Sequence, residues 1–216
     1  EIATIYREVP LDIKDLENIR YTPLDGKELE SLYEELEFYS FLKNFRQEEV
    51  ATKKFAFEKV TDKTLLDEKE YALYLELDGN NYHQANIIGM GLSSEENNYF
   101  VSKDQISSVL AKIEDKVLYT YDLKKNIVAL NRLNIKMPSC NTDLMILKAL
   151  LDDSSKDDIA FYMVPNGYNV NFLENLWKKD ILLDETLEKE IVLKARFIYD
   201  TRDRAILDIK RDDMYE

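Results

Sequence analysis

The stretch that decides the fold runs from Glu70 to Ser93 and reads EYALYLELDGNNYHQANIIGMGLS. Leucine occupies every second position of its first part, as in a strand with one buried face. The buried face would carry Leu73, Leu75 and Leu77, and the opposite face Tyr74, Glu76 and Asp78. The turn residues 78–81 follow. Residues 87–92 then return as a nearly continuous apolar run, which is typical of a central strand buried on both faces. The stretch therefore predicts a β-hairpin at the centre of a sheet.

Composition sets the broad class of the protein. With 216 residues, 45% of them hydrophobic, the chain can bury a substantial core. Its net charge of −14 provides no broad positive field for a polyanion, so the isolated chain should bind DNA poorly. A single cysteine, Cys140, excludes an internal disulfide, and a single histidine, His83, excludes a His-rich zinc site. No apolar run approaches the length of a membrane span, and no export signal is visible, so we expect a cytoplasmic protein.

The segments around the hairpin predict alternating strands and helices. Residues 1–50 read as a tether followed by an amphipathic helix with Leu29, Leu32, Tyr33 and Leu36 on one face. Phe55 to Phe57 is expected to begin a strand or to continue the linker. Ser102 and Gln105 are expected to form a capping box for the helix that follows. Further strands are expected at 98–101 and 116–121, and further helices at 123–133, with Leu123, Ile127 and Leu130 inward, at 144–151 and at 185–216. This order predicts an α/β fold, with a mixed central sheet flanked by helices.

The quoted hairpin resembles the 3′→5′ exonuclease domain of family A DNA polymerases of the bacterial DNA polymerase I type. Four further segments resemble the same family in order and spacing: IATIYREVPLD, LESLYEELEFYSFLKNF, DLKKNIVALNRLNIKMPSCNTDLMILKALL and the closing RAILDIKRDDMYE. The resemblance covers nearly the whole chain and implies a ribonuclease H-like exonuclease fold. It assigns residues 1–50 to the segment after a 5′-nuclease domain, and residues 51–216 to an exonuclease-like domain that ends at the approach to the polymerase thumb. The NYHQA segment resembles polymerases of Gram-positive bacteria in which the exonuclease site has decayed.

The resemblance also locates the positions at which active members of the family hold metal ions. Hydrolysis by the two-metal route needs several carboxylates that converge on Mg²⁺. The first carboxylate pair of the family falls on Tyr74 and Glu76, the next Asp on Asn126, and the late Tyr and Asp on Glu190 and Lys194. Only Glu76 keeps its carboxylate among the metal positions, so the resemblance implies an inactive site without metal or cofactor. We expect the Lys194 ammonium to lie near Glu76, within about 8 Å, where it would replace a metal ion.

Two other carboxylates, those of Asp78 and Asp143, are candidates to replace the lost metal ligands. A slide of two residues along the strand would let Glu76 and Asp78 imitate the lost pair, but the buried leucine face fixes the register, so Asp78 is expected to be a turn residue. Asp143 precedes an apolar helical stretch and is expected to cap it. The pair Glu190 and Lys194, at a spacing of four residues, would ordinarily lie on a solvated helix face.

Three functions remain open on the sequence. The first is an inactive exonuclease domain that supports DNA synthesis by the remaining domains of the same polymerase, with Mg²⁺ bound only in the polymerase domain and DNA bound only through the full-length protein. The second is a weakly active, metal-dependent 3′→5′ proofreading exonuclease. The third is an acidic interaction module unrelated to polymerases, which predicts a fold without the nuclease-like sheet. We expect a monomer without membrane contact.

Overall fold

The predicted hairpin forms the centre of the sheet in the computed structural model, which describes residues 26–36, 38, 55–151, 156–177 and 183–211. Strand β2 (Glu70–Leu77) pairs antiparallel with β3 (Ile87–Ser93), and β3 pairs antiparallel with β4 (Asn98–Ser102). Among the described residues the sheet has six strands in the order β1-β4-β3-β2-β5-β6, so β2 and β3 are its two central strands. The third candidate function, an acidic interaction module unrelated to polymerases, predicts a fold without such a sheet and is therefore incompatible with the structure.

The outer strands make the sheet a mixed one. β5 (Val117–Thr120) pairs parallel with β2, and the short β6 (Thr142–Asp143) pairs parallel with β5. The short β1 (Glu58–Lys59) pairs parallel with β4. It begins after the expected Phe55–Phe57, whose backbone is outside any strand. Asp143, which the sequence predicts only as a helix cap, also belongs to strand β6.

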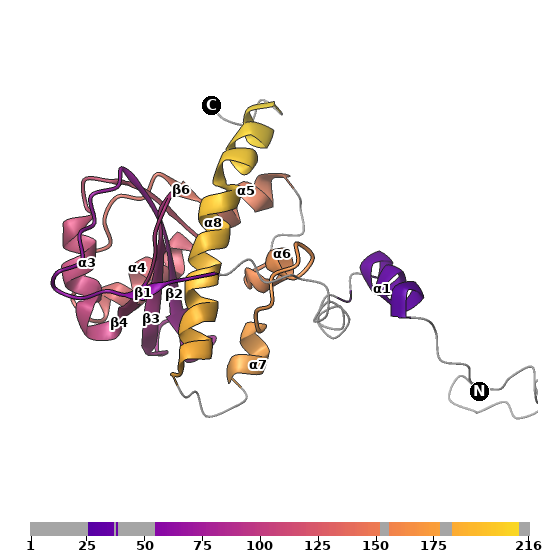
Figure 1. The fold of residues 1–216 in the computed structure, drawn as a ribbon, viewed down its shortest axis with the longest axis horizontal. Helices are drawn as coiled ribbons and strands as arrows, with labels where there is room; N and C mark the ends of the chain where they lie inside the picture. Colours follow the sequence, from indigo (N-terminus) through magenta and orange to yellow (C-terminus); the bar gives the residue numbers. More distant parts are fainter. Residues whose placement is uncertain (1–25, 37, 39–54, 152–155, 178–182, 212–216) are drawn as a thin grey trace, which may run out of the picture.

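Helices cover both faces of the sheet (Figure 1). The leucine face of β2 packs against α3 (Ile106–Lys112) and α4 (Leu123–Asn131). The opposite face, which carries Ala72 and Tyr74, packs against α8 (Glu185–Arg211). The other helices within the described residues are α1 (Gly26–Glu35), α5 (Leu144–Leu151), α6 (Ala160–Met163) and α7 (Leu173–Trp177). The predicted alternation along β2 is therefore confirmed, because its two faces enter two different cores.

Three local expectations are wrong. Ser102 forms no capping box: a short 3₁₀ turn (Lys103–Gln105) intervenes, and the Ser102 hydroxyl donates to the Gln105 side-chain oxygen at 3.0 Å instead of capping a backbone N–H. Ile127 is exposed, because α4 turns Lys125 and Asn126 toward the sheet. Glu190 and Lys194 lie buried against the sheet and not on a solvated face.

The segment 39–54 lies outside the described residues, as do residues 1–25, so most of the expected tether is outside them too. The helix expected around Leu29 to Leu36 is present as α1. Among the described helices, none is long and apolar enough to span a bilayer.

Candidate functional site: a buried ion pair at the exonuclease position

A buried ion pair occupies the position where the resemblance places the exonuclease metals. Glu76 lies near the end of β2 and Lys194 on α8, and the Lys194 Nζ donates to Glu76 Oε2. Each side chain is only 1% exposed. The predicted contact between these two residues is confirmed. Because a charge that loses its hydration must be compensated, each of them depends on the other for its stability in the core.

Glycine at position 91 brings α8 close enough for this contact. A Cβ atom added at Gly91 would lie 2.4 Å from the Ile191 carbonyl oxygen, so only glycine lets the helix backbone rest directly on β3. Gly91 is paired with Tyr74 in the β2–β3 register. Lys194 follows Ile191 by almost one helical turn and therefore reaches over β2 to Glu76.

Tyr74 fills the space beside the ion pair. Its side chain is fully buried, and its ring centroid lies 4.7 Å from Lys125 Nζ and 5.0 Å from Lys194 Nζ. Burial, together with the Glu76 carboxylate, raises the pKa of the Tyr74 hydroxyl well above its usual value. That hydroxyl has no hydrogen-bond partner among the described residues. Tyr74 thus presents a neutral aromatic ring to two ammonium groups, at the position where the resemblance implies a metal-binding carboxylate in active members of the family.

Lys125 is a second cation of the site that the sequence did not single out. Its side chain is buried, and burial lowers the pKa of its ammonium while the Glu76 carboxylate opposes that shift. The sequence indicated a role for Lys125 only through its position directly before Asn126, on a helix whose buried face was predicted to carry Ile127 instead. Two ammonium groups near one glutamate form a poor environment for a divalent cation, because like charges repel at short range.

Asn126 is fully buried and serves the sheet. Its Nδ2 donates to Thr120 Oγ1 at 2.7 Å and to the Tyr121 carbonyl oxygen at 3.3 Å, which fastens the start of α4 to the end of β5. Its Oδ1 has no partner among the described residues. The amide is therefore held by neutral hydrogen bonds, and it brings no negative charge to the site.

Glu190 bonds to Asn171 and not to Lys194. Its two carboxylate oxygens accept hydrogen bonds from the backbone N–H of Asn171, at 3.0 Å, and from its Nδ2, at 2.6 Å. Asp158, which the sequence reading missed, accepts from the backbone N–H groups of Ala160 at 2.9 Å and Leu173 at 2.7 Å. Burial raises the pKa of the Asp158 carboxyl, and the Lys194 ammonium counteracts this. Both carboxylates are thus committed to holding the chain that leads into α7.

The segment from Asn171 to Trp177 is a strap over this end of the sheet. Besides its bonds to Glu190 and Asp158, it is fastened by Trp177, whose Nε1 donates to the Leu77 carbonyl oxygen at 3.1 Å. Leu77 ends β2 directly after Glu76. The strap therefore connects α8 to the end of the strand that carries the ion pair.

The other two acidic candidates have structural roles, as expected. Asp78 accepts from Asn86, from its backbone N–H at 2.6 Å and its Nδ2 at 2.8 Å, and so closes the hairpin turn. Asp143 accepts from the backbone N–H groups of Asp122, Leu123 and Met145 at 2.7–3.0 Å, so it caps α4 as well as α5. Within the described part of the chain, no group of three or more His, Cys, Asp or Glu side chains is placed to hold a metal ion.

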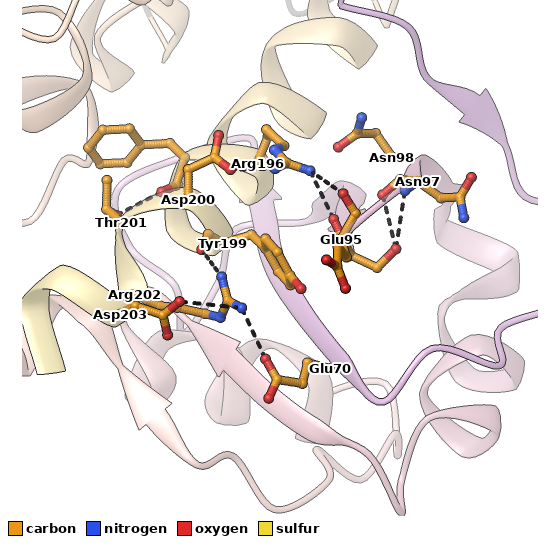
Figure 2. Close-up of polar contacts among 12 residues, drawn as sticks. Glu70, Glu95, Asn97, Asn98, Arg196, Tyr199, Asp200, Thr201, Arg202 and Asp203 are labelled. Carbon is orange, nitrogen blue, oxygen red and sulfur yellow. Dashed lines mark hydrogen bonds and ion pairs between the residues drawn. The ribbon is translucent and has the colours of Figure 1, made fainter.

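A separate polar cluster lies at the opposite end of β2 (Figure 2). Arg202 of α8 donates to Glu70 at 3.1 Å, and its guanidinium lies 3.7 Å from the ring centroid of Tyr199. Arg196 donates to the Ser94 carbonyl oxygen at 2.9 Å. These contacts fasten α8 to the beginning of β2 and to the turn after β3, so the helix is held at both ends of the sheet.

Comparison with solved structures identifies proteins of similar fold. The fold is similar to that of NrnC from Brucella melitensis, with a TM-score of 0.57 at 11% identity over 74% of this chain and 84% of that one. It is also similar to RNase D from Escherichia coli, with a TM-score of 0.54 at 10% identity over 68% of this chain and 41% of that one. At these identities the two likenesses show that this chain shares its fold with both structures.

Sequence comparison gives the family. The model of the DNA polymerase I ribonuclease H-like domain matches residues 73–201, more than half of the chain. The chain therefore belongs to the ribonuclease H-like domain family of DNA polymerase I. It is 28% identical to DNA polymerase I of Geobacillus stearothermophilus over 99% of its own length, and 28% identical to that of Lactococcus lactis subsp. cremoris over 97%. It covers 26% and 25% of these two relatives, about a quarter of their length.

Proposed function

We propose that this chain is a catalytically inactive 3′→5′ exonuclease-like domain of a DNA polymerase I, which supports the polymerase part of the same protein. The observation that carries the proposal is the buried ion pair between Lys194 and Glu76. Phosphodiester hydrolysis by the two-metal route needs ions about 3.5–4 Å apart, held by several carboxylates. Here the one carboxylate kept at those positions is already bonded to an ammonium group, and a second ammonium, that of Lys125, lies nearby.

The donor set does not fit the Mg²⁺ ions that such a mechanism requires. Hard divalent cations select carboxylate oxygens, whereas the positions of the lost ligands carry a phenol, an amide and an ammonium group. Glu190 and Asp158 do not compensate, because they hold the strap. Template-directed DNA synthesis and its Mg²⁺ would belong to the polymerase part, and DNA would be contacted through the full-length protein. We propose that the full-length polymerase is monomeric and cytoplasmic.

A nuclease assay tests the proposal. The purified chain is incubated with single-stranded DNA labelled at its 5′ end, in Mg²⁺ or Mn²⁺, beside a proofreading-active polymerase I as positive control. We expect no shortening above that seen with the Glu76→Ala variant, which controls for contaminating nucleases. Metal-dependent shortening by the natural chain that Glu76→Ala abolishes would instead establish the weakly active exonuclease.

Metal binding gives a second readout that does not depend on activity. A ligand that binds the folded state raises its stability by about 2.7 kcal/mol when present at a hundred times its Kd. We expect the thermal midpoint of the chain to respond equally to Mg²⁺ and to a matched ionic strength of Na⁺. A specific rise with Mg²⁺ that is lost in Glu76→Ala would contradict the proposal.

A further inference from the structure

A hollow of about 570 Å³ lies at the beginning of β2, at the end of the strand opposite to the buried ion pair. The chain that enters β2, the turn after β3 and helix α8 form it together, and they contribute Asp67, Glu68, Lys69, Glu70, Glu95, Tyr199 and Arg202. We name it the acidic hollow, because its lining carries four carboxylates against two cationic side chains. Small-molecule sites typically have volumes of about 300–1,000 Å³. The acidic hollow therefore has the size of a ligand site.

Three of its carboxylates have no cationic partner within the described part of the chain. Asp67, Glu68 and Glu95 form no ion pair there. Glu70 differs from them, because it accepts from Arg202 at 3.1 Å. Negative charges that line one hollow repel each other, so a bound cation would relieve the repulsion.

Tyr199 directs an unused polar group at these carboxylates. Figure 2 shows its hydroxyl pointing into the space between Glu70 and Glu95. Tyr199 is only 7% exposed, and its hydroxyl has no hydrogen-bond partner among the described residues. Burial raises the pKa of this hydroxyl; Arg202 opposes the rise, and Glu70 and Glu95 add to it. The phenol thus stays neutral, and its oxygen can accept a hydrogen bond from a cationic donor.

Surrounding contacts hold the lining of the acidic hollow in place. Arg196 donates to the carbonyl oxygens of Ser94 at 2.9 Å and Glu95 at 3.3 Å, which fixes the turn after β3. The backbone N–H of Glu68 donates to the Tyr71 hydroxyl at 3.0 Å, and the Glu68 carboxylate accepts from the Ser94 hydroxyl at 3.4 Å. A site whose groups are already positioned loses less entropy when a ligand binds.

We propose that the acidic hollow binds an aliphatic polyamine, a flexible molecule whose ammonium groups are separated by short methylene chains. A single metal ion does not fit, because no three acidic side chains of the described residues are placed to hold one. Carboxylates that are spread around a hollow instead complement charges that are spread along a chain. Arg202 leaves the other carboxylates to the ligand, because its guanidinium is engaged by Glu70 and by the Tyr199 ring at 3.7 Å. Partly exposed ion pairs are weak and are screened by salt, so we expect a Kd on the order of 0.1–1 mM at low ionic strength.

Isothermal titration calorimetry of the chain with spermidine at low ionic strength tests the proposal. We expect saturable one-to-one binding that is weakened about tenfold or more in Glu68→Gln/Glu95→Gln, and about threefold in Tyr199→Phe, which keeps the ring. The matched control is Asp104→Asn/Glu114→Gln, which removes the same number of charges from exposed positions next to α3. It should bind spermidine as the natural chain does. Thermal midpoints of all variants, measured by circular dichroism, show that each one is folded.

Four results would overturn the proposal. The first is an absence of saturable binding. The second is an equal loss of affinity in both double variants, because the overall negative charge of the chain would then attract the ligand. The third is a Mg²⁺ affinity as high as that for spermidine that Glu68→Gln/Glu95→Gln abolishes, which would make the hollow a metal site. The fourth is displacement of spermidine by a lysine-rich peptide that binds tenfold more tightly, which would assign the hollow to a protein partner. None of these results bears on the proposed function, because Glu76 and Lys194 lie at the other end of β2.

Discussion

The Lys194–Glu76 pair should behave as a buried ion pair in which each charge is costly without the other. Lys194→Met keeps most of the side-chain volume and removes the ammonium, so it leaves the Glu76 carboxylate in the core. Both side chains are 1% exposed, so solvent screening is small. Breaking one half of such a pair typically costs 3–5 kcal/mol, and we expect about 3 kcal/mol, because Lys125 remains near the carboxylate.

Urea and thermal unfolding followed by circular dichroism provide the measurement. For a domain of this size about 3 kcal/mol corresponds to a fall in Tm of roughly 6–12 °C. The double variant Glu76→Leu/Lys194→Met removes both charges and should recover most of the loss, since apolar replacement of a complete buried pair is often neutral or stabilising. The coupling energy from the double-mutant cycle should therefore reach about 2 kcal/mol or more.

A surface pair supplies the control. Arg204 of α8 lies 3.9 Å from Asp208, with its side chain 89% exposed, and Arg204→Met should change stability by less than about 1 kcal/mol. A Lys194→Met variant as stable as the natural chain would refute the argument, because the ammonium would then be dispensable. A double variant no better than Lys194→Met alone would show that packing, and not charge, accounts for the loss.

Three further predictions concern the framework of the site. Gly91→Ala should displace α8, because the new methyl group would meet the Ile191 carbonyl oxygen at 2.4 Å. We expect about 1–3 kcal/mol of destabilisation in urea unfolding. An unchanged unfolding midpoint would show that α8 can move away from β3 at no cost in stability. Asp143→Ala removes the acceptor of backbone N–H groups in two helices and should cost about 2 kcal/mol, against less than about 1 kcal/mol for Asp78→Ala in the exposed hairpin turn. Burial raises the pKa of Tyr71 to about 12 from 10.0, so between these pH values the folded state keeps a proton that the unfolded state releases. The contribution of Tyr71 to the free energy of unfolding is complete below pH 10 and is lost as the pH rises toward 12. Unfolding between pH 9 and 11 should show this decline, and Tyr71→Phe should reduce its slope.

Local pattern was sufficient for the elements at the centre of the molecule. The alternation at Leu73 and Leu75 and the continuous apolar run of β3 follow directly from which faces are buried, so the hairpin and its central place were predictable. The alternation of helices and strands along the sequence predicted the mixed sheet. The pattern failed where polar contacts decide orientation. Ile127 was expected to be inward, but the helix turns Asn126 inward to meet Thr120 and the end of β5.

The sequence by itself determined the α/β architecture, the register of the central strand and, through its resemblance to a family, the positions Tyr74, Glu76 and Lys194. Only the tertiary structure decided what these residues contact. In it Lys125 lies beside Tyr74, and Glu190 accepts hydrogen bonds from Asn171 of the strap instead of pairing with Lys194. The physical reason is that periodicity reports which face of an element is buried, whereas the partner of a buried charge is set by how closely two distant elements approach, here at Gly91.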